Sequence, residues 1–442
     1  MEDNTLKRTM KLSHLVIFGV AFLTPMIAYT IYGTISTASH GVETGSVIFA
    51  TIAMLFTALS YGHMAKAYPT AGSTYTYSRK AINSKLGVLA GWIVLLGYVF
   101  FPMAIWLIGA QYLGDAVPAV PSWLWLILFI VVTSGINIIG VEVGTVVNFI
   151  LVGIQVAIII AFLAFSINYV TEGNGLATLA SFDPFYNPDI DFSFIVAGAA
   201  ASCYCFLGFD ALTTFTEDAI DPTKNIPRSI ILTLIVCGAI FVVVTYFTHL
   251  AHPSFEYANP DSAAYEIARE VAPAVFGGIF LIGLIAGQFA AGLAAQASGA
   301  RLLYAMARDG VMPKKLFGRL HKTRRTPVNA ICLTGLVALL AVFLDVTSAT
   351  AYISFGGLVA FIFVNIAVIF QYFIKQNERS GKGVFLYLIL PIIGAIFCLY
   401  LLISLDRLAI ILGCIWIVLG IIYVLILTKG LKEEPPELGI DA

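Results

Sequence analysis

Long apolar blocks, each close to the length of a membrane-crossing helix, recur along the whole chain. An α-helix needs about 20 consecutive apolar residues to cross a bilayer. Of the 442 residues, 60% are hydrophobic and 11% are charged, whereas about 25% of the residues of a typical soluble domain are charged. We therefore expect an all-α, polytopic membrane protein with a single membrane domain and about twelve transmembrane helices. The expected spans cover residues 12–37, 44–67, 86–113, 122–140, 144–168, 192–217, 229–250, 274–305, 327–346, 349–374, 384–404 and 408–428.

The lysines and arginines indicate how these spans are oriented. If the N-terminus is cytoplasmic, only Arg269 and Arg407 of the 24 basic residues fall in outer segments. Cytoplasmic loops of membrane proteins are enriched in lysine and arginine, so we expect both termini in the cytoplasm and the chain in the plasma membrane. The outer segments carry several acids, which either attract a cationic substrate or are what is left when basic residues are excluded.

The cysteines and histidines do not predict a metal site. All six cysteines lie within apolar blocks, so we expect free thiols that behave as small hydrophobic side chains. Cys203 and Cys205 are two residues apart, which points them to different sides of a helix. The histidines fall at span ends or in loops, without a cluster at metal-ligand spacing. We expect no metal, no cofactor and no catalytic residues.

Two of the apolar blocks are interrupted near their middle. The first contains GVAFLTPMIAY (19–29) with Pro25, and the sixth contains FLGFDA (206–211) with Gly208. Pro25 cannot donate to the carbonyl one turn earlier, and glycine lowers helix propensity by about 1 kcal/mol relative to alanine. Unpaired backbone in hydrocarbon is costly unless it faces a polar cavity or a ligand, and paired interrupted helices point to the substrate site of secondary transporters. The alternative is a simple kink in each helix.

Asp210 lies directly beside the second interruption. A carboxylate near the bilayer centre costs at least about 2.5 kcal/mol and marks a functional site by default; the alternative is a cap on the second half-helix. Asp210, Thr214 and Glu217 are spaced to share one face of an α-helix. We expect Asp210 to bind substrate, and Asp210 or Glu217 to act in proton coupling or as a gate, unless Glu217 is simply solvated at the helix end.

The segment DSAAYEIAREVA (261–272) predicts a short amphipathic helix with Asp261 or Ser262 at its cap. Such a helix over the outer mouth would serve as a gate element. Packing alone would also explain it.

At these residues the chain resembles the amino acid–polyamine–organocation (APC) superfamily of permeases. The motifs that carry the resemblance are YPTAGSTYTYSRKAI (68–82), FLGFDALTTFTED (206–218), DPTKNIPRSI (221–230) and RLLYAMARDGVMP (301–313). The third and fourth are similar to cytoplasmic loops of that superfamily, as is the first. The resemblance implies a LeuT-like fold of two inverted five-helix repeats, here residues 12–168 and 192–374, followed by two extra helices at 384–428.

The resemblance also implies a substrate site between the first and sixth crossings, flanked by the third, eighth and tenth. The substrate-binding residues expected there are Gly19, Ala21, Phe22, Thr24 and Pro25 in the first crossing, Phe206, Gly208, Phe209 and Asp210 in the sixth, and Tyr98, Gln288 and the stretch 354–357 around them. For each aromatic residue, ordinary packing is the alternative.

Two departures from the superfamily bear on substrate and coupling. Amino acid carriers usually have a Gly-x-Gly break in helix 1, whereas GVAFLTP here is similar to the variant seen in bacterial putrescine importers. A diamine has no carboxylate and favours acids, carbonyls and aromatic faces. The fifth span holds Asn148 and Gln155 but not the lysine of some proton-coupled relatives, and the eighth lacks the Ser/Thr pair of a sodium site. Sodium coupling is therefore disfavoured, and proton symport is expected, with exchange as the alternative.

These features together predict a secondary active transporter that imports an amine or amino acid by alternating access, with putrescine or a related polyamine favoured. The alternatives are a small neutral amino acid permease, an exchanger, or a nutrient sensor that does not transport. An enzyme is disfavoured because no nucleophile–base pair lies at mid-span, ATP-driven transport because no phosphate-binding loop occurs, and a channel because no pore segment repeats. The expected partners are the substrate, the lipid bilayer and protons, with no nucleic acid, and the chain is expected to be a monomer or a weak homodimer.

Overall fold

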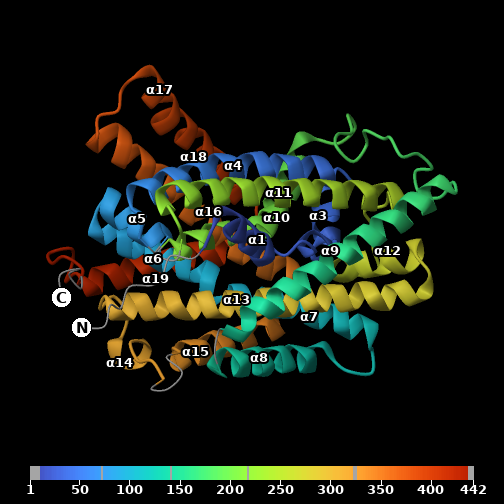
Figure 1. Cartoon of the computed structure of the whole chain (residues 1–442), viewed down its shortest axis with the longest axis horizontal. Helices are drawn as coiled ribbons and strands as arrows, with labels where there is room; N and C mark the ends of the chain where they lie inside the picture. The colour runs from blue at the N-terminus through green and yellow to red at the C-terminus, as the bar shows by residue number, and fades with distance from the viewer. Residues whose placement is uncertain (1–9, 71–72, 140–141, 217–218, 322–325, 437–442) are drawn as a thin grey trace.

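The helices run side by side along the molecule in a computed structural model that describes residues 10–70, 73–139, 142–216, 219–321 and 326–436. Figure 1 shows most of them following the long axis, with α5 (Ser73–Ala81), α14 (Lys314–Phe317) and the turns that follow α19 (Arg407–Leu427) at one end of the bundle. We call this the terminal end, and the opposite end, where α12 (Ala263–Val271) lies, the α12 end. Among the described residues, eleven helices are long and apolar enough to cross a membrane, and the ninth predicted span is a shorter apolar helix, Val328–Phe343. The prediction of an all-α membrane protein is confirmed.

The described elements follow the predicted order. The first are α1 (Leu12–Leu23), α2 (Ile27–Thr30), α3 (Tyr32–Ser39), α4 (Glu43–Ala67), α5 (Ser73–Ala81), α6 (Ser84–Val99), α7 (Phe101–Ala116), α8 (Ser122–Ile139) and α9 (Glu142–Thr171). They are followed by α10 (Phe192–Ser202), α11 (Pro222–Ala251), α12, α13 (Ala274–Arg308), α14 (Lys314–Phe317), α15 (Val328–Ala338), α16 (Val346–Val368), α17 (Gly381–Val384), α18 (Leu390–Ile403) and α19 (Arg407–Leu427). Short 3₁₀ segments lie at Cys203–Phe206, Phe209–Phe215, Pro260–Ser262 and Leu339–Phe343, and π-helical turns at Ile369–Lys375 and Phe385–Ile389.

The last helix exposes apolar side chains in a pattern that fits a surrounding bilayer. Along α19 the residues Ile411, Ile415, Val418, Ile422 and Ile426 recur at helical spacing, and each is between 46% and 72% exposed. An apolar stripe of this kind would be an aggregation site in water. In hydrocarbon it is the favoured surface.

The first crossing is interrupted at the predicted place. α1 ends at Leu23, Thr24 has a φ of +58°, and the chain resumes in α2 and α3. Because Pro25 has no N–H, the Ala21 carbonyl lacks its normal helical donor. On the other side of the break, the Met26 N–H donates to Oε1 of the Gln155 side chain on α9 at 3.4 Å.

The sixth crossing is interrupted at Leu207 and Gly208. α10 and the turn Cys203–Phe206 come before the break, Gly208 has a φ of +104°, and the second half, Phe209–Phe215, is a 3₁₀ helix. α1 packs against this second half, while α3 packs against α10. The two broken crossings therefore contact each other on both sides of their breaks. The prediction of two interrupted helices is confirmed, and the alternative of simple kinks is wrong.

Two polar motifs that resemble loops are partly helical. The motif at 68–82 contains α5, and the motif at 221–230 forms the first turns of α11. Pro222 stands at the first position of α11, where the missing N–H needs no partner. The apolar blocks do not include these turns because hydropathy detects only the apolar part of a helix.

The amphipathic segment near residue 261 has the predicted helix, preceded by a 3₁₀ turn. Its first turn, Pro260–Ser262, is capped by Asn259, whose side chain accepts from the Asp261 N–H at 3.1 Å. Pro260 starts this turn earlier than expected. Ser262 stands at the N-cap position of α12, as one of the two predictions had it, although its side chain makes no capping hydrogen bond within the described residues. α12 follows directly.

Candidate substrate-binding site

A small cavity lies where the two broken crossings meet α6, α7 and α16. Its lining consists of Phe22, Val94, Gly97, Tyr98, Phe101, Leu207, Gly208, Asp210, Gly356, Gly357, Ala360 and Phe361. The volume is about 30 Å³, which leaves room for about two water molecules. The cavity is therefore nearly closed in this conformation, and a small-molecule ligand needs more space than it offers.

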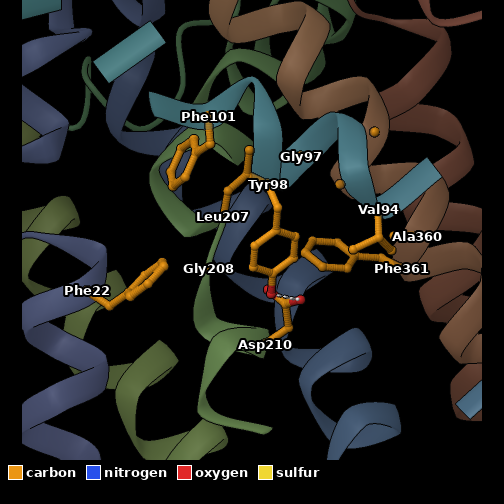
Figure 2. Close-up of a pocket in the computed structure, with 12 residues that line it drawn as sticks. Phe22, Val94, Gly97, Tyr98, Phe101, Leu207, Gly208, Asp210, Ala360 and Phe361 are labelled. Atoms are coloured by element: carbon orange, nitrogen blue, oxygen red, sulfur yellow. Dashed lines mark hydrogen bonds between the residues drawn. The ribbon is translucent and has the colours of Figure 1, made fainter. Parts of the chain in front are cut away.

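Asp210 supplies the charge in the described lining, and it is only 6% exposed. Its Oδ2 accepts hydrogen bonds from the Tyr98 hydroxyl at 2.9 Å and from the Ser73 hydroxyl at 3.1 Å. Figure 2 shows the Tyr98 hydroxyl directed at the carboxylate, with the ring of Phe361 beside that of Tyr98. Two donors from different elements thus orient the carboxylate at the wall of the cavity.

Tyr98 reaches this position because the third crossing is divided. The predicted span 86–113 consists of α6 and α7, joined at Phe100, since Pro102 cannot donate to the Tyr98 carbonyl. A Cβ at Gly97 would meet no atom within 4 Å. The missing side chain of Gly97 therefore adds to the space beside Tyr98.

Ser73 closes the site toward the terminal end. It is the first residue of α5, which lies at that end of the bundle (Figure 1). The next residue, Thr74, shares a hydrogen bond of 2.7 Å with the Tyr61 hydroxyl on α4. α5 is thus connected by hydrogen bonds both to α4 and to Asp210.

The break in the sixth crossing requires glycine at position 208. Its φ of +104° is a conformation that other residues rarely adopt. A Cβ there would lie 2.1 Å from Cε1 of Phe22. The ring of Phe22 therefore packs directly on bare backbone, which brings α1 close to the break.

Four of the expected substrate-binding residues line the cavity, namely Phe22, Tyr98, Gly208 and Asp210, and so do Gly356 and Gly357 of the stretch 354–357. The cavity is not lined by Gly19, Ala21, Thr24, Pro25, Phe206, Phe209 and Gln288. Gly19 and Phe206 pack against α11 instead. The ring of Phe209 packs against the ring of Phe361. Which side of a broken helix faces the cavity depends on the angle at the break, and spacing along the sequence does not specify that angle.

The second half of the sixth crossing also changes an expected helix face. A 3₁₀ helix has three residues per turn, and the Thr213 hydroxyl donates to the Asp210 carbonyl at 2.6 Å. The prediction that Asp210, Thr214 and Glu217 share one face assumed α-helical spacing, and at 3₁₀ spacing positions 210 and 214 do not lie on one face. Glu217 itself lies outside the residues that the structure describes.

Sequence reasoning missed several residues that complete the site: Ser73, Val94, Gly97, Phe101, Leu207, Ala360 and Phe361. The polar motif at 68–82 was a usable signal for Ser73. The others are apolar residues within apolar spans, and nothing in their local sequence separates a cavity wall from ordinary packing.

A larger cavity of about 320 Å³ lies toward the α12 end. Its lining includes Thr34, Thr37 and Ala38 on α3, Ala197, Ala200 and Ala201 on α10, and Thr347, Thr350 and Ala351 on α16, with Pro260 and Asp406 among the others. α3 and α10 are the halves of the two broken crossings on this side. The cavity therefore lies beside the same two broken crossings whose breaks line the small cavity.

Comparisons with known proteins agree with this architecture. The family model described as "Amino acid permease" matches residues 14–429. The low-affinity putrescine importer PlaP of Escherichia coli (strain K12) is 38% identical over 434 residues, which cover 98% of this chain and 96% of that protein. The methylthioribose transporter and the branched-chain amino acid permease BcaP of Bacillus subtilis (strain 168) are 28% and 24% identical, each over 95% of this chain and 93% of the relative. The resemblance to APC permeases is confirmed, and the chain is a multi-pass membrane protein that belongs to the amino acid permease family of transporters.

Proposed function

We propose that this protein is a secondary active transporter that imports putrescine or a related polyamine across the plasma membrane. The observation that carries the proposal is the buried carboxylate of Asp210, on the wall of a cavity that is otherwise apolar and aromatic. By the distribution of lysine and arginine, the terminal end would face the cytoplasm and the α12 end the outside. The protein is proposed to carry its substrate without chemical change.

A protonated amine suits this wall better than a carboxylate does. Among the described lining residues Asp210 alone is charged, so an ammonium group would gain a charge-assisted hydrogen bond. A substrate carboxylate would meet no basic side chain in this lining. The rings of Phe22, Tyr98 and Phe361 offer faces for cation–π contact. The name of the relative PlaP, a putrescine importer, supports the same substrate class.

Asp210 would also link substrate binding to closure at the terminal end. Its Oδ2 accepts from Ser73 on α5 and from Tyr98 on α6. An incoming ammonium group would compete for the same oxygen, because a charged donor binds a carboxylate more strongly than a hydroxyl does. Loss of the Ser73 contact would then loosen α5, and the terminal end could open with substrate in place.

The two cavities support an alternating-access mechanism. The cavity beside α3 and α10 has a volume of about 320 Å³, whereas the one at Asp210 has about 30 Å³. The substrate would enter from the α12 end, occupy the break as Phe22 moves aside, and leave past α5. The breaks in the first and sixth crossings would be the hinges, one in each of two repeats at 12–168 and 192–374, with 384–428 outside the repeats. The chain would act as a monomer or a weak homodimer.

The test is counterflow of labelled putrescine in proteoliposomes that contain the purified protein, comparing wild type with Asp210→Asn. Asparagine keeps an acceptor for Tyr98 and Ser73 but removes the charge. Removing one partner of a buried charge pair costs about 2–5 kcal/mol, so putrescine should bind about 30- to 5,000-fold more weakly. Asp189→Asn, in an exposed segment, is the control and should transport like wild type.

A thermal-shift panel separates the substrate classes. A ligand that binds only the folded protein raises its melting temperature, so putrescine and related amines should stabilise wild type but not Asp210→Asn. Stabilisation by α-amino acids alone would overturn the amine assignment. Normal counterflow by Asp210→Asn would remove Asp210 from the binding site.

A further inference from the structure

Three titratable side chains form a hydrogen-bonded cluster away from the substrate cavity. Glu43 is the first residue of α4 and His249 lies near the end of α11, and their residues are 0% and 5% exposed. Nδ1 of His249 lies 2.8 Å from Oε1 of Glu43, and the Tyr32 hydroxyl donates to the same oxygen at 2.6 Å. Ionisable groups inside a membrane protein are costly and mark functional sites by default, proton-binding sites among them.

The cluster joins α4 and α11 to α3, which is one half of the broken first crossing. α4 and α11 pack closely against each other, and they carry Glu43 and His249. Tyr32 begins α3, whose residues Thr34 and Thr37 line the larger cavity. α3 is therefore the wall between that cavity and the cluster, with Tyr32 as its contact to Glu43.

The net charge of this cluster depends on one proton. With Glu43 ionised and His249 neutral, one negative charge is buried, and Oε2 of Glu43 has no hydrogen-bond partner within the described ranges. An added proton converts the pair to imidazolium and carboxylate, which together carry no net charge. An uncompensated buried charge costs far more than a hydrogen-bonded ion pair. Binding of a proton therefore removes the net charge that the cluster would otherwise bury.

Among the described residues, the groups around the cluster are titratable and include no lysine or arginine. They are Tyr32 from α3, Tyr257 from the segment after α11 with the ring of His252 stacked on it, Asp183 from the segment before α10, and Glu266 from α12. The ring of Tyr257 packs on that of Tyr32, and its hydroxyl donates to Ser36 on α3 at 2.9 Å. In the described part of the chain, His249 is the ion-pair partner of Glu43. A proton is thus the cation that can neutralise this site.

We propose that Glu43 and His249 form a proton-binding site, and that a proton bound there stabilises the docked position of α3 against α4 and α11. When α3 is docked, the cluster is dry and holds the proton between Nδ1 and Oε1. When α3 moves away, water reaches the cluster, the separate charges are solvated, and the proton leaves to that solution. In this structure α3 is docked, so its movement away from α4 and α11 would release one proton. This step rests on the proposed alternating access, and it assigns that movement a proton site distinct from Asp210.

The experiment measures how fast a cysteine behind α3 is labelled by a water-soluble maleimide in the purified, unliganded protein. Ser36 lies one turn from Tyr32 on the same face and is 1% exposed, so Ser36→Cys reports release of α3. Thr178→Cys, exposed in the segment between α9 and α10, corrects for the pH dependence of the thiol itself. Both are made with Cys332 and Cys414, the exposed native cysteines, replaced by alanine.

The ratio of the two labelling rates should rise as pH increases from 6 to 8. A histidine in water changes its charge near pH ~6.5, and linkage of one proton changes an equilibrium by up to about tenfold per pH unit. Adding Glu43→Gln should abolish this pH dependence. Glu270→Gln is the matched control, because Glu270 pairs with His252 at 2.9 Å but is exposed, and it should leave the pH dependence intact.

Equal pH dependence with and without Glu43→Gln would overturn the proposal, and so would a Ser36→Cys protein that is not labelled at any pH. Should Glu43→Gln fail to fold, His249→Gln tests the same proton with an amide donor in place of the ring. None of these measurements uses an amine. If the Ser36→Cys protein shows the pH-dependent labelling but wild type shows no putrescine counterflow, the proposed substrate is refuted and the proton site stands.

Discussion

Gly208→Ala tests whether the break in the sixth crossing requires a glycine at this position. The residue has a φ of +104°, and a new Cβ would lie 2.1 Å from Cε1 and 2.5 Å from Cδ1 of Phe22. The backbone conformation should cost alanine about 1–2 kcal/mol. Forcing a methyl group against a packed ring adds about 1–3 kcal/mol. The unfolding free energy should therefore fall by about 2–5 kcal/mol, the sum of these two effects.

A double-mutant cycle with Phe22→Ala separates the two effects. In the Phe22→Ala background the methyl group has room, so only the backbone cost of about 1–2 kcal/mol should remain. The difference between the two backgrounds is then a coupling energy of about 1–3 kcal/mol. The assay is reversible unfolding of the purified protein in mixed micelles with increasing SDS.

Gly135→Ala is the matched control for this cycle. Gly135 lies within α8, and a Cβ there would meet no atom within 4 Å. In a helix this change should stabilise the protein by about 0.5–1 kcal/mol. If Gly208→Ala behaves like Gly135→Ala, or if Phe22→Ala leaves its cost unchanged, the described geometry of the break is wrong.

Two further substitutions test the support of the first break and a buried acid in the turn before α12. Gln155→Leu removes the acceptor of the Met26 N–H, which should lower stability by about 1–3 kcal/mol; unfolding in the same micelles measures this, and an unchanged stability would show that the amide does not support the break. Asp261→Asn tests pH dependence, because burial, and then the nearby charge of Asp345, raise the pKa of Asp261 above its ordinary value. Since the folded state binds that proton more tightly than the unfolded state does, its stabilising effect is lost as pH rises through the raised pKa. The melting temperature of Asp261→Asn should therefore rise relative to that of wild type between pH 4 and pH 7. Parallel curves of melting temperature against pH for the two proteins would contradict a raised pKa of Asp261.

The sequence by itself determined the features that depend on neighbouring residues. Apolar length sets where a helix can cross hydrocarbon, so the order of the crossings was predictable, and Pro25 and Gly208 marked the two breaks because their effect on the backbone is local. Asp210 stood out for the same reason, since a carboxylate in an apolar block is costly wherever the helix points. The polar first turns of α5 and α11 escaped notice because hydropathy carries no information about polar helical residues.

Tertiary structure alone decided which side chains meet. Ser73 and Asp210 are 137 residues apart, and Glu43 and His249 are 206 apart, yet each pair is in hydrogen-bond contact. Hydropathy along a chain does not specify the rotation of each helix about its axis, the angle at a break, or a change from α to 3₁₀ geometry. For that reason Phe206 and Gln288, expected to line the cavity, lie outside its lining. The buried pair at the start of α4 and the end of α11 became visible only when the helices were packed together.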